Sequence, residues 1–269
     1  MPTEDLRFAA SLLLTPPAEW ASATRTALDA GYDTVVTSDH PGMGSPFQTL
    51  AVAAGAGAAT GTYLIDPSQW PPGLLAREVD TAITLSGGRF ELGLGVPQPS
   101  GPQAGPAAVA AALDAVEARI EPGRRPRVLL AVFTDDDIPL AAERADIVSI
   151  VGADIVAGGG LHLHSRARIA GQIGRVRELA GRPVEVNLGV KHLVLTDDRA
   201  GAAATLRPQA APALTEKELL DLPHALFGSA AEIAGQIRAD ARDLGFGYLS
   251  MHQNLVAGFT PVISALRGR

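Results

Sequence analysis

The clearest pattern in the chain is an alternation of short apolar runs with longer helical runs. The first run, Arg7–Leu14, is almost wholly apolar, as expected of a strand that is buried on both faces. Repeated alternation of this kind predicts βα units around a parallel sheet. The predicted strands are Arg7–Leu14, Asp33–Ser38, Thr62–Ile65, Arg89–Leu94, Arg127–Phe133, Asp146–Val151, one strand within Val184–Leu195, and Gly247–His252.

The helical runs fall between these strands. Ser229 followed by Glu232 is a capping-box pattern, which predicts that a helix begins there. Eight strands suit one closed (β/α)8 TIM barrel over residues 1–269, an α/β fold whose site lies at the C-terminal ends of the strands. The predicted helices are Pro17–Ala30, Pro46–Thr60, Pro72–Leu85, Ala107–Arg119, Ile138–Arg144, Ser165–Ala180, Glu216–Leu222, Ser229–Leu244 and Gly258–Leu266.

The most informative segment is Leu75–Gly95, in which a helix stops at Ser86-Gly87-Gly88 and a strand follows. The two glycines permit the positive φ angles of a tight turn. The strand ends in Gly93-Leu94-Gly95, where missing side chains let a ligand approach the backbone. This segment resembles the LAxE…LSgGRfelGlG motif of the luciferase-like monooxygenase family. Ala30–His40, ending in Ser-Asp-His, resembles that family's second strand.

Further segments extend this resemblance over most of the chain, namely Pro46–Thr60, Leu140–Val148, Leu195–Arg199 and Leu226–Gln236. The last three match the branch that uses the deazaflavin F420. The resemblance implies a luciferase-like (β/α)8 barrel, a homodimer, and a site for F420 or, second, for flavin mononucleotide (FMN). The residues that would hold such a cofactor are Ile65, Asp66, Gly95, Gly228 and Ser229.

Composition narrows the function further. The net charge of −7 without a basic cluster argues against nucleic acid as a partner. No apolar run reaches the length that spans a bilayer, and the N-terminus lacks the pattern of a secretory signal. The absence of cysteine excludes thiolate metal sites and fits a cytoplasmic enzyme. The chain has two lysines, Lys191 and Lys217, and its other basic residues are arginines.

Three residues are candidates for catalysis: His40, Asp39 and His252. His40 ends the second predicted strand, so it faces the barrel mouth, and histidine exchanges protons near neutral pH. Asp39 either orients His40 or caps a turn. His252 ends the eighth strand. His192 lies in the seventh, and the histidine spacing is unlike that of known metal motifs, so no metal site is expected.

Other residues are expected to contact a substrate. Tyr63 and Trp70 flank the loop after the third strand, where they form an apolar wall or pack beneath the loop. In the family, this strand end contacts the flavin, often through an unusual peptide bond. The complete predicted set of substrate contacts is Tyr63, Trp70, His192, Gln253 and Phe133.

The chain departs from its family at two places. Relatives carry a glycine cluster after the fifth strand, where backbone N–H groups can hold a cofactor phosphate, whereas this chain has Phe133-Thr134-Asp135-Asp136-Asp137. Carboxylates repel a phosphate, unless these aspartates only cap the next helix. The insertion usual after the fourth strand is reduced to a short Pro/Gly-rich linker.

These departures favour a barrel enzyme without bound flavin. Such an enzyme would catalyse the cyclisation, cycloaddition or isomerisation of a hydrophobic natural-product intermediate by holding it in a reactive conformation. Two alternatives remain open: an F420- or FMN-dependent oxidoreductase that transfers hydride to a small organic substrate, and a non-catalytic dimer partner.

Overall fold

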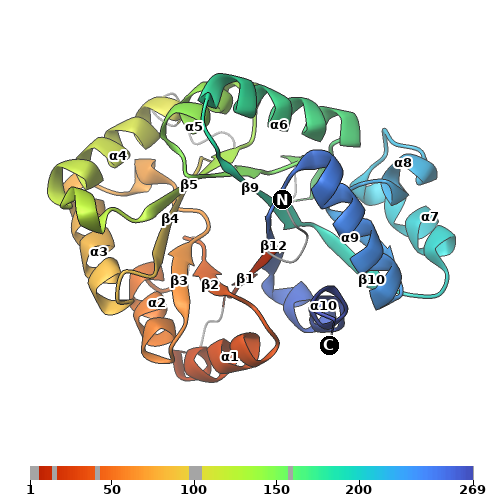
Figure 1. Ribbon diagram of the computed structural model, residues 1–269, viewed down its shortest axis with the longest axis horizontal. Helices are drawn as coiled ribbons and strands as arrows, with labels where there is room; N and C mark the ends of the chain where they lie inside the picture. The colour runs from red at the N-terminus through yellow and green to blue at the C-terminus, as the bar shows by residue number, and fades with distance from the viewer. Residues whose placement is uncertain (1–5, 14–16, 40–42, 97–104, 157–159, 269) are drawn as a thin grey trace.

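The computed structural model describes residues 6–13, 17–39, 43–96, 105–156 and 160–268 (Figure 1). Eight parallel strands close into a barrel in the order β1-β12-β9-β6-β5-β4-β3-β2. The predicted (β/α)8 barrel is therefore confirmed. The barrel strands are β1 (Arg7–Ser11), β2 (Thr34–Thr37), β3 (Ala59–Thr62), β4 (Phe90–Leu94), β5 (Arg127–Val132), β6 (Ile147–Ile150), β9 (Glu185–Val190) and β12 (Tyr248–His252).

Helices surround the barrel in the order in which they alternate with the strands (Figure 1). Among the described connections, short 3-10 turns lie at Pro67–Gln69, Pro122–Arg124 and Asp135–Asp137. The helices are α1 (Pro17–Asp29), α2 (Pro46–Gly55), α3 (Pro72–Leu85), α4 (Pro106–Arg119), α5 (Ile138–Arg144), α6 (Arg166–Ala180), α7 (Arg199–Ala210), α8 (Glu216–Leu220), α9 (Ala230–Leu244) and α10 (Gln253–Leu266).

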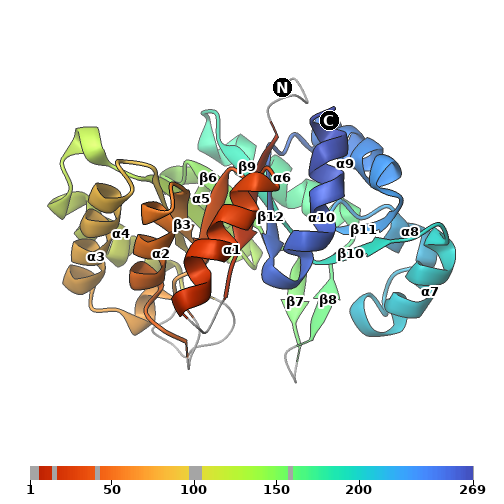
Figure 2. The ribbon, with the colours of Figure 1, turned by 90° about the horizontal axis from the view of Figure 1, so that it is seen from below.

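Two small sheets lie outside the barrel. The hairpin of β7 (Ala153–Ile155) and β8 (Leu161–Leu163) is antiparallel and follows β6. Strands β10 (His192–Leu195) and β11 (Ala225–Gly228) pair in parallel beside α7 and α8. Figure 2 shows the β7–β8 hairpin projecting from the end of the barrel opposite to both chain termini. That end holds the C-terminal ends of the strands.

Several predicted boundaries were wrong, for local reasons. Helix α2 ends at Gly55 instead of Thr60, because Gly57 takes a positive φ of 96° and the chain turns into β3. Strand β3 consequently begins at Ala59. The single strand expected within Val184–Leu195 is two strands that are separated at Lys191.

The turn and cap predictions around the barrel were accurate. Gly87 and Gly88 have φ angles of 62° and 82°, as the tight turn between α3 and β4 requires. Ser229 caps α9 and forms the reciprocal capping box with Glu232.

The role predicted for Gly93 differs from the one in the structure. A Cβ atom at Gly93 would lie 2.1 Å from the carbonyl oxygen of Thr62, so the glycine is needed for packing between strands instead of ligand approach.

One large apolar core lies between the barrel and its helices, and it contains aromatic pairs such as Phe8 with Phe259, whose ring centroids are 5.9 Å apart. A second cluster lies under α7 and α8 and includes Phe227. Within the described segments, no helix has both the length and the apolar character needed to cross a bilayer.

Candidate active site

A cleft of about 410 Å³ opens at the C-terminal end of the barrel. Apolar side chains from the β7–β8 hairpin and from the segments after β3, β5 and β6 form its walls, and smaller polar groups lie among them. This is the end of the barrel at which the sequence predicted a site. The lining residues are Ser11, Ser38, Asp39, Tyr63, Leu64, Asp66, Phe133, Val151, Ile155, Leu161, Gly189, Val190, Lys191, Ser250, His252 and Asn254.

The polar floor of the cleft centres on the Tyr63 hydroxyl. It lies 3.1 Å from Ser149 Oγ and donates to Asn187 Oδ1 at 3.3 Å. Ser149 and Ser250 also donate to Asn187 Oδ1, at 2.8 and 3.4 Å. Burial raises the pKa of Tyr63, so its phenol stays protonated and can donate a hydrogen bond. The Tyr63–Leu64 peptide bond is cis, an unusual peptide bond at the strand end where the resemblance implies one.

Lys191 lies where the chain leaves the barrel between β9 and β10. Its backbone N–H donates to the carbonyl of His224 at 2.8 Å, and its side chain lines the cleft. A Cβ atom at Gly189 would lie 3.2 Å from Lys191 Nζ, so the amine extends back over the end of β9. Burial lowers the pKa of Lys191 to about 8.

Asp39 and Trp70 form a brace at the rim. The Trp70 indole N–H donates to Asp39 Oδ2 at 2.6 Å, and the indole packs edge-on against Phe47, with ring centroids 5.4 Å apart. Asp39 lines the cleft, whereas Trp70 supports it from behind. The carboxylate of Asp39 is therefore occupied in positioning the loop after β3. His40, the strongest sequence candidate, lies outside the described residues.

The other predicted polar residues are separated by the fold. His252 lines the cleft and is exposed, and its Nδ1 lies 2.7 Å from Asn254 Oδ1. Gln253 does not line the cleft; its Oε1 accepts the N–H of Leu13 at 2.6 Å and ties α10 to the segment after β1. His192 also points elsewhere, because it belongs to β10 outside the barrel. Its prediction as a cleft residue was wrong.

The loop after β5 binds its own backbone. Asp137 Oδ2 accepts the N–H groups of Phe133 and Thr134 at 3.0 and 2.8 Å, which are the groups a phosphate would need at this strand end. Asp135 accepts a hydrogen bond from Gln172 at 3.1 Å. These aspartates thus cap the loop, and Phe133 lines the cleft as predicted.

The residues proposed to hold a cofactor do not fit a phosphate-bearing tail. Above Gly95, a Cβ atom would meet Ala131 at 2.8 Å, Leu64 at 3.0 Å and Phe133 at 3.2 Å, so protein fills this space. Ile65 is fully buried. Asp66 lines the cleft, but its carboxylate accepts the N–H of Ser68.

The second predicted phosphate platform lies at the start of α9. Glu232 Oε2 accepts the N–H of Ser229 at 2.8 Å, so this donor is satisfied within the chain. Gly228 ends β11, which pairs with β10 outside the barrel. Neither Gly228 nor Ser229 lines the cleft. In the described part of the chain, no group of three or more acidic, histidine or cysteine side chains is arranged to hold a metal ion.

Sequence reasoning named Tyr63 but missed Lys191 and the polar partners of Tyr63 in the floor. The signals were present: Lys191 directly follows the strand Glu185–Val190 in a chain with two lysines, and Asn187 is a polar residue within that strand. Ser149 and Ser250 are likewise single polar residues within buried strands. A polar side chain that alternates with apolar residues in a barrel strand points into the barrel interior.

The overall structure is similar to those of several solved enzymes. No protein-family model matches the chain, and no curated protein sequence matches it. Long-chain alkane monooxygenase (LadA) aligns with a TM-score of 0.72 at 10% identity, over 98% of this chain and 92% of the other. The coenzyme F420 dependent tetrahydromethanopterin reductase from Methanopyrus kandleri aligns with a TM-score of 0.70 at 12% identity, over 97% of both chains.

A third neighbour is the EDTA monooxygenase EmoA from Chelativorans sp. BNC1, with a TM-score of 0.70, 13% identity, and coverage of 98% of this chain and 94% of the other. At such identities the similarity concerns the fold, and it spans nearly the whole length of each protein. The chain therefore has the (β/α)8 barrel fold that its sequence predicted, and this fold is similar to those of the three enzymes over nearly their whole length.

Proposed function

We propose that this protein is an enzyme that cyclises or isomerises a small, largely apolar molecule without a bound flavin or deazaflavin. The observation that carries the proposal is the capping of the β5 loop. Asp137 already holds the N–H groups of Phe133 and Thr134, and it places a negative charge where a cofactor phosphate would need donors. The capping of Ser229 by Glu232 supports the same conclusion at the second platform.

The cleft suits a substrate with an apolar body and a polar oxygen. Leu64, Phe133, Val151, Ile155 and Leu161 supply apolar walls. The neutral Tyr63 phenol would exchange its 3.3 Å hydrogen bond to Asn187 Oδ1 for one to a carbonyl or hydroxyl oxygen of the substrate, and it would stabilise negative charge that develops there. Holding a flexible molecule in a reactive conformation can itself lower a barrier substantially.

An oxidoreductase that uses F420, or else FMN, is the second candidate. It is supported by the neighbouring structures, among which is a reductase described as F420-dependent. It is opposed by the capped platforms. The third candidate is a non-catalytic dimer partner. In that case no ligand would be turned over in the cleft.

Titration of the purified protein with F420 and with FMN separates the first two candidates. Absorbance and fluorescence would report binding, and we expect no saturable binding at micromolar concentrations. Micromolar affinity for either cofactor would overturn the proposal. The matched variant is Asp137→Ser, which removes the carboxylate and leaves the loop N–H groups free; improved cofactor affinity in this variant would support the role assigned to Asp137.

A further inference from the structure

Lys191 is placed like a reactive group and not like a structural one. It directly follows strand β9 at the barrel mouth, and its backbone is fixed by the hydrogen bond from its N–H to the His224 carbonyl at 2.8 Å. Its side chain is only partly exposed and lines the cleft. The amine therefore faces the space that a substrate would occupy.

No carboxylate in the described part of the chain pairs with this amine. Among residues 6–13, 17–39, 43–96, 105–156 and 160–268, none forms an ion pair with Lys191 or a hydrogen bond with its Nζ. The titratable neighbours are His224, whose pKa is lowered by burial and by Lys191 to about 3, and His192, whose pKa is lowered for the same reasons. Both imidazoles are neutral at pH 7, so neither competes with a substrate for the lysine.

Three polar groups lie close together around the backbone of Gly189, at the floor of the cleft. From the position that a Cβ atom would take there, Tyr63 Oη lies 2.9 Å away, Lys191 Nζ 3.2 Å and Ser250 Oγ 3.6 Å. A Cβ atom would be crowded at these distances, so the close approach of the amine to the hydroxyl groups depends on the glycine. A carbonyl group that reaches this floor from the cleft would have its carbon near the amine and its oxygen near hydroxyl groups.

We propose that Lys191 is a nucleophile that forms an imine with an aldehyde or ketone whose apolar body fills the cleft. The neutral amine attacks the carbonyl carbon, a C–N bond forms, and the carbonyl oxygen takes up a proton to give a carbinolamine. Loss of water breaks the C–O bond and yields the protonated imine, with no oxidant or reductant required. The iminium then acidifies the adjacent C–H bond, which is the activation that an isomerisation or cyclisation needs.

The environment of the amine supports this chemistry. A lysine with a pKa of about 8 has, at pH 7, about 300-fold more free amine than one with the ordinary value of 10.5. Burial raises the pKa of Tyr63, so its phenol stays neutral and can stabilise the carbonyl oxygen by a hydrogen bond while water supplies the proton. The inference names the substrate class of the proposed function and rests on that proposal only in placing the substrate in this cleft.

Reductive trapping with a simple aldehyde tests the inference without knowledge of the natural substrate. The protein is incubated at pH 7 with hexanal and sodium cyanoborohydride, which reduces an imine to a stable secondary amine, and the modified peptides are quantified by mass spectrometry. Lys217 is exposed on α8 and provides an internal comparison in the same molecule. We expect Lys191 to be labelled at least about tenfold faster than Lys217, since it carries more free amine.

Two variants sharpen the experiment. Gly189→Ala would place a methyl group 2.9 Å from Tyr63 Oη and 3.2 Å from Lys191 Nζ, which forces these side chains apart, at a position whose φ is ordinary for any residue. It should slow labelling of Lys191 and leave that of Lys217 unchanged. Lys217→Arg should leave the labelling of Lys191 unchanged, and circular dichroism would verify that both variants are folded.

Equal labelling of the two lysines, or the absence of label at Lys191, would overturn the inference. So would rapid labelling of Lys191 that Gly189→Ala does not slow, because the placement of the amine beside Tyr63 would then be irrelevant. The trapping experiment tests the lysine chemistry, and the cofactor titration tests the proposed function, so each can fail without the other. Label at Lys191 together with tight F420 binding would refute the proposed function and keep the lysine chemistry, whereas the opposite pair of results would do the reverse.

Discussion

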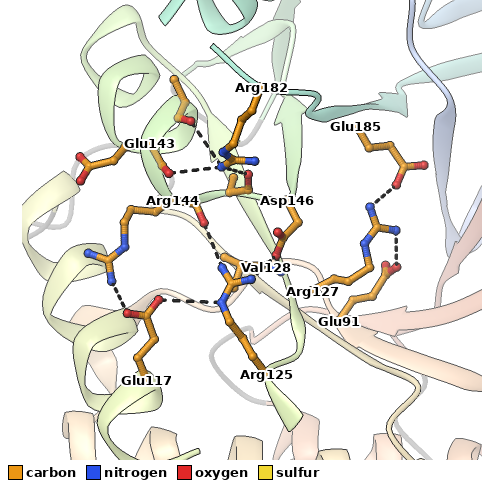
Figure 3. A network of polar contacts seen from close by, with 12 residues as sticks. Glu91, Glu117, Arg125, Arg127, Val128, Glu143, Arg144, Asp146, Arg182 and Glu185 are labelled. Carbon is orange, nitrogen blue, oxygen red and sulfur yellow. Dashed lines mark hydrogen bonds and ion pairs between the residues drawn. The ribbon is translucent and has the colours of Figure 1, made fainter. Parts of the chain in front are cut away.

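The two ends of the barrel differ in how their charged residues are paired. At the end where the strands begin, Arg7 pairs with Glu91 and Glu185, and Arg127 pairs with the same two carboxylates. Figure 3 shows Arg127 reaching both glutamates across the strand ends. At the mouth, Lys191 has no such partner among the described residues. The charges at the base form ion pairs between barrel strands, whereas the amine of Lys191 at the mouth is left free to meet a substrate.

The base is a satisfied network that extends beyond the four central residues. The Tyr248 hydroxyl donates to Glu91 Oε2 at 3.1 Å, and the guanidinium of Arg7 lies 4.3 Å from the centroid of the Tyr248 ring. Around it, Arg125 bonds Asp146 at 2.9 Å and Arg144 bonds Glu117 at 3.0 Å (Figure 3). Removing one partner of such a pair leaves the remaining charge buried without compensation, which lowers the stability of the fold.

The largest effect is expected from breaking the base. Glu91→Gln removes the charge that faces Arg7 and Arg127, in a side chain whose residue is 8% exposed. We expect the free energy of unfolding to fall by about 3 kcal/mol, as for other broken buried pairs. Urea denaturation would measure it. The exposed pair Arg77–Glu78 supplies the control: Glu78→Gln should change stability by less than about 0.5 kcal/mol. Similar values for both variants would erase the distinction between paired base and ordinary surface.

At the mouth, removing a charged side chain should raise the free energy of unfolding instead of lowering it. The pKa of Lys191 is lowered to about 8 in the folded protein, from 10.5 in the unfolded chain, so at pH 7 the folded state bears the cost of a desolvated charge. Lys191→Met keeps the apolar part of the side chain and removes that cost. We expect a gain of about 2 kcal/mol at pH 7 by urea denaturation.

The pH dependence of this gain follows from the direction of the shift. Below pH 8 the lysine is charged in both states and the full cost is present. Between pH 8 and 10.5 the unfolded chain binds more protons, so wild-type stability rises relative to Lys191→Met and the difference between them shrinks. A loss of stability in Lys191→Met at pH 7 would mean that the lysine is well paired, and the contrast between the two ends would fail.

The same contrast explains how far the sequence could predict this protein. The barrel follows from alternation, and turns and caps follow from local chemistry, as with Gly87 and Ser229, so these were foreseen. The site depends on where the chain leaves the barrel. His192 and Lys191 are neighbours in sequence, yet the break between β9 and β10 sends one outside and leaves the other in the cleft. Periodicity within a run cannot locate such a break.

The smallest effect concerns the floor of the cleft, and it tests whether the mouth is built for chemistry more than for stability. Tyr63→Phe removes one of three hydroxyl donors to Asn187 Oδ1, while Ser149 and Ser250 remain as donors. Stability should therefore fall by only about 1 kcal/mol. Trapping of hexanal at Lys191 should slow by about tenfold, because the hydrogen-bond donor nearest the amine is lost.

A control at Tyr32 separates the two roles, because its hydroxyl lies away from the cleft and donates to the Val256 carbonyl at 2.9 Å. Tyr32→Phe should have a comparable cost in stability and no effect on trapping. If both variants slow trapping equally, the Tyr63 phenol acts through the fold alone, and the mouth differs from the base only in its unpaired lysine.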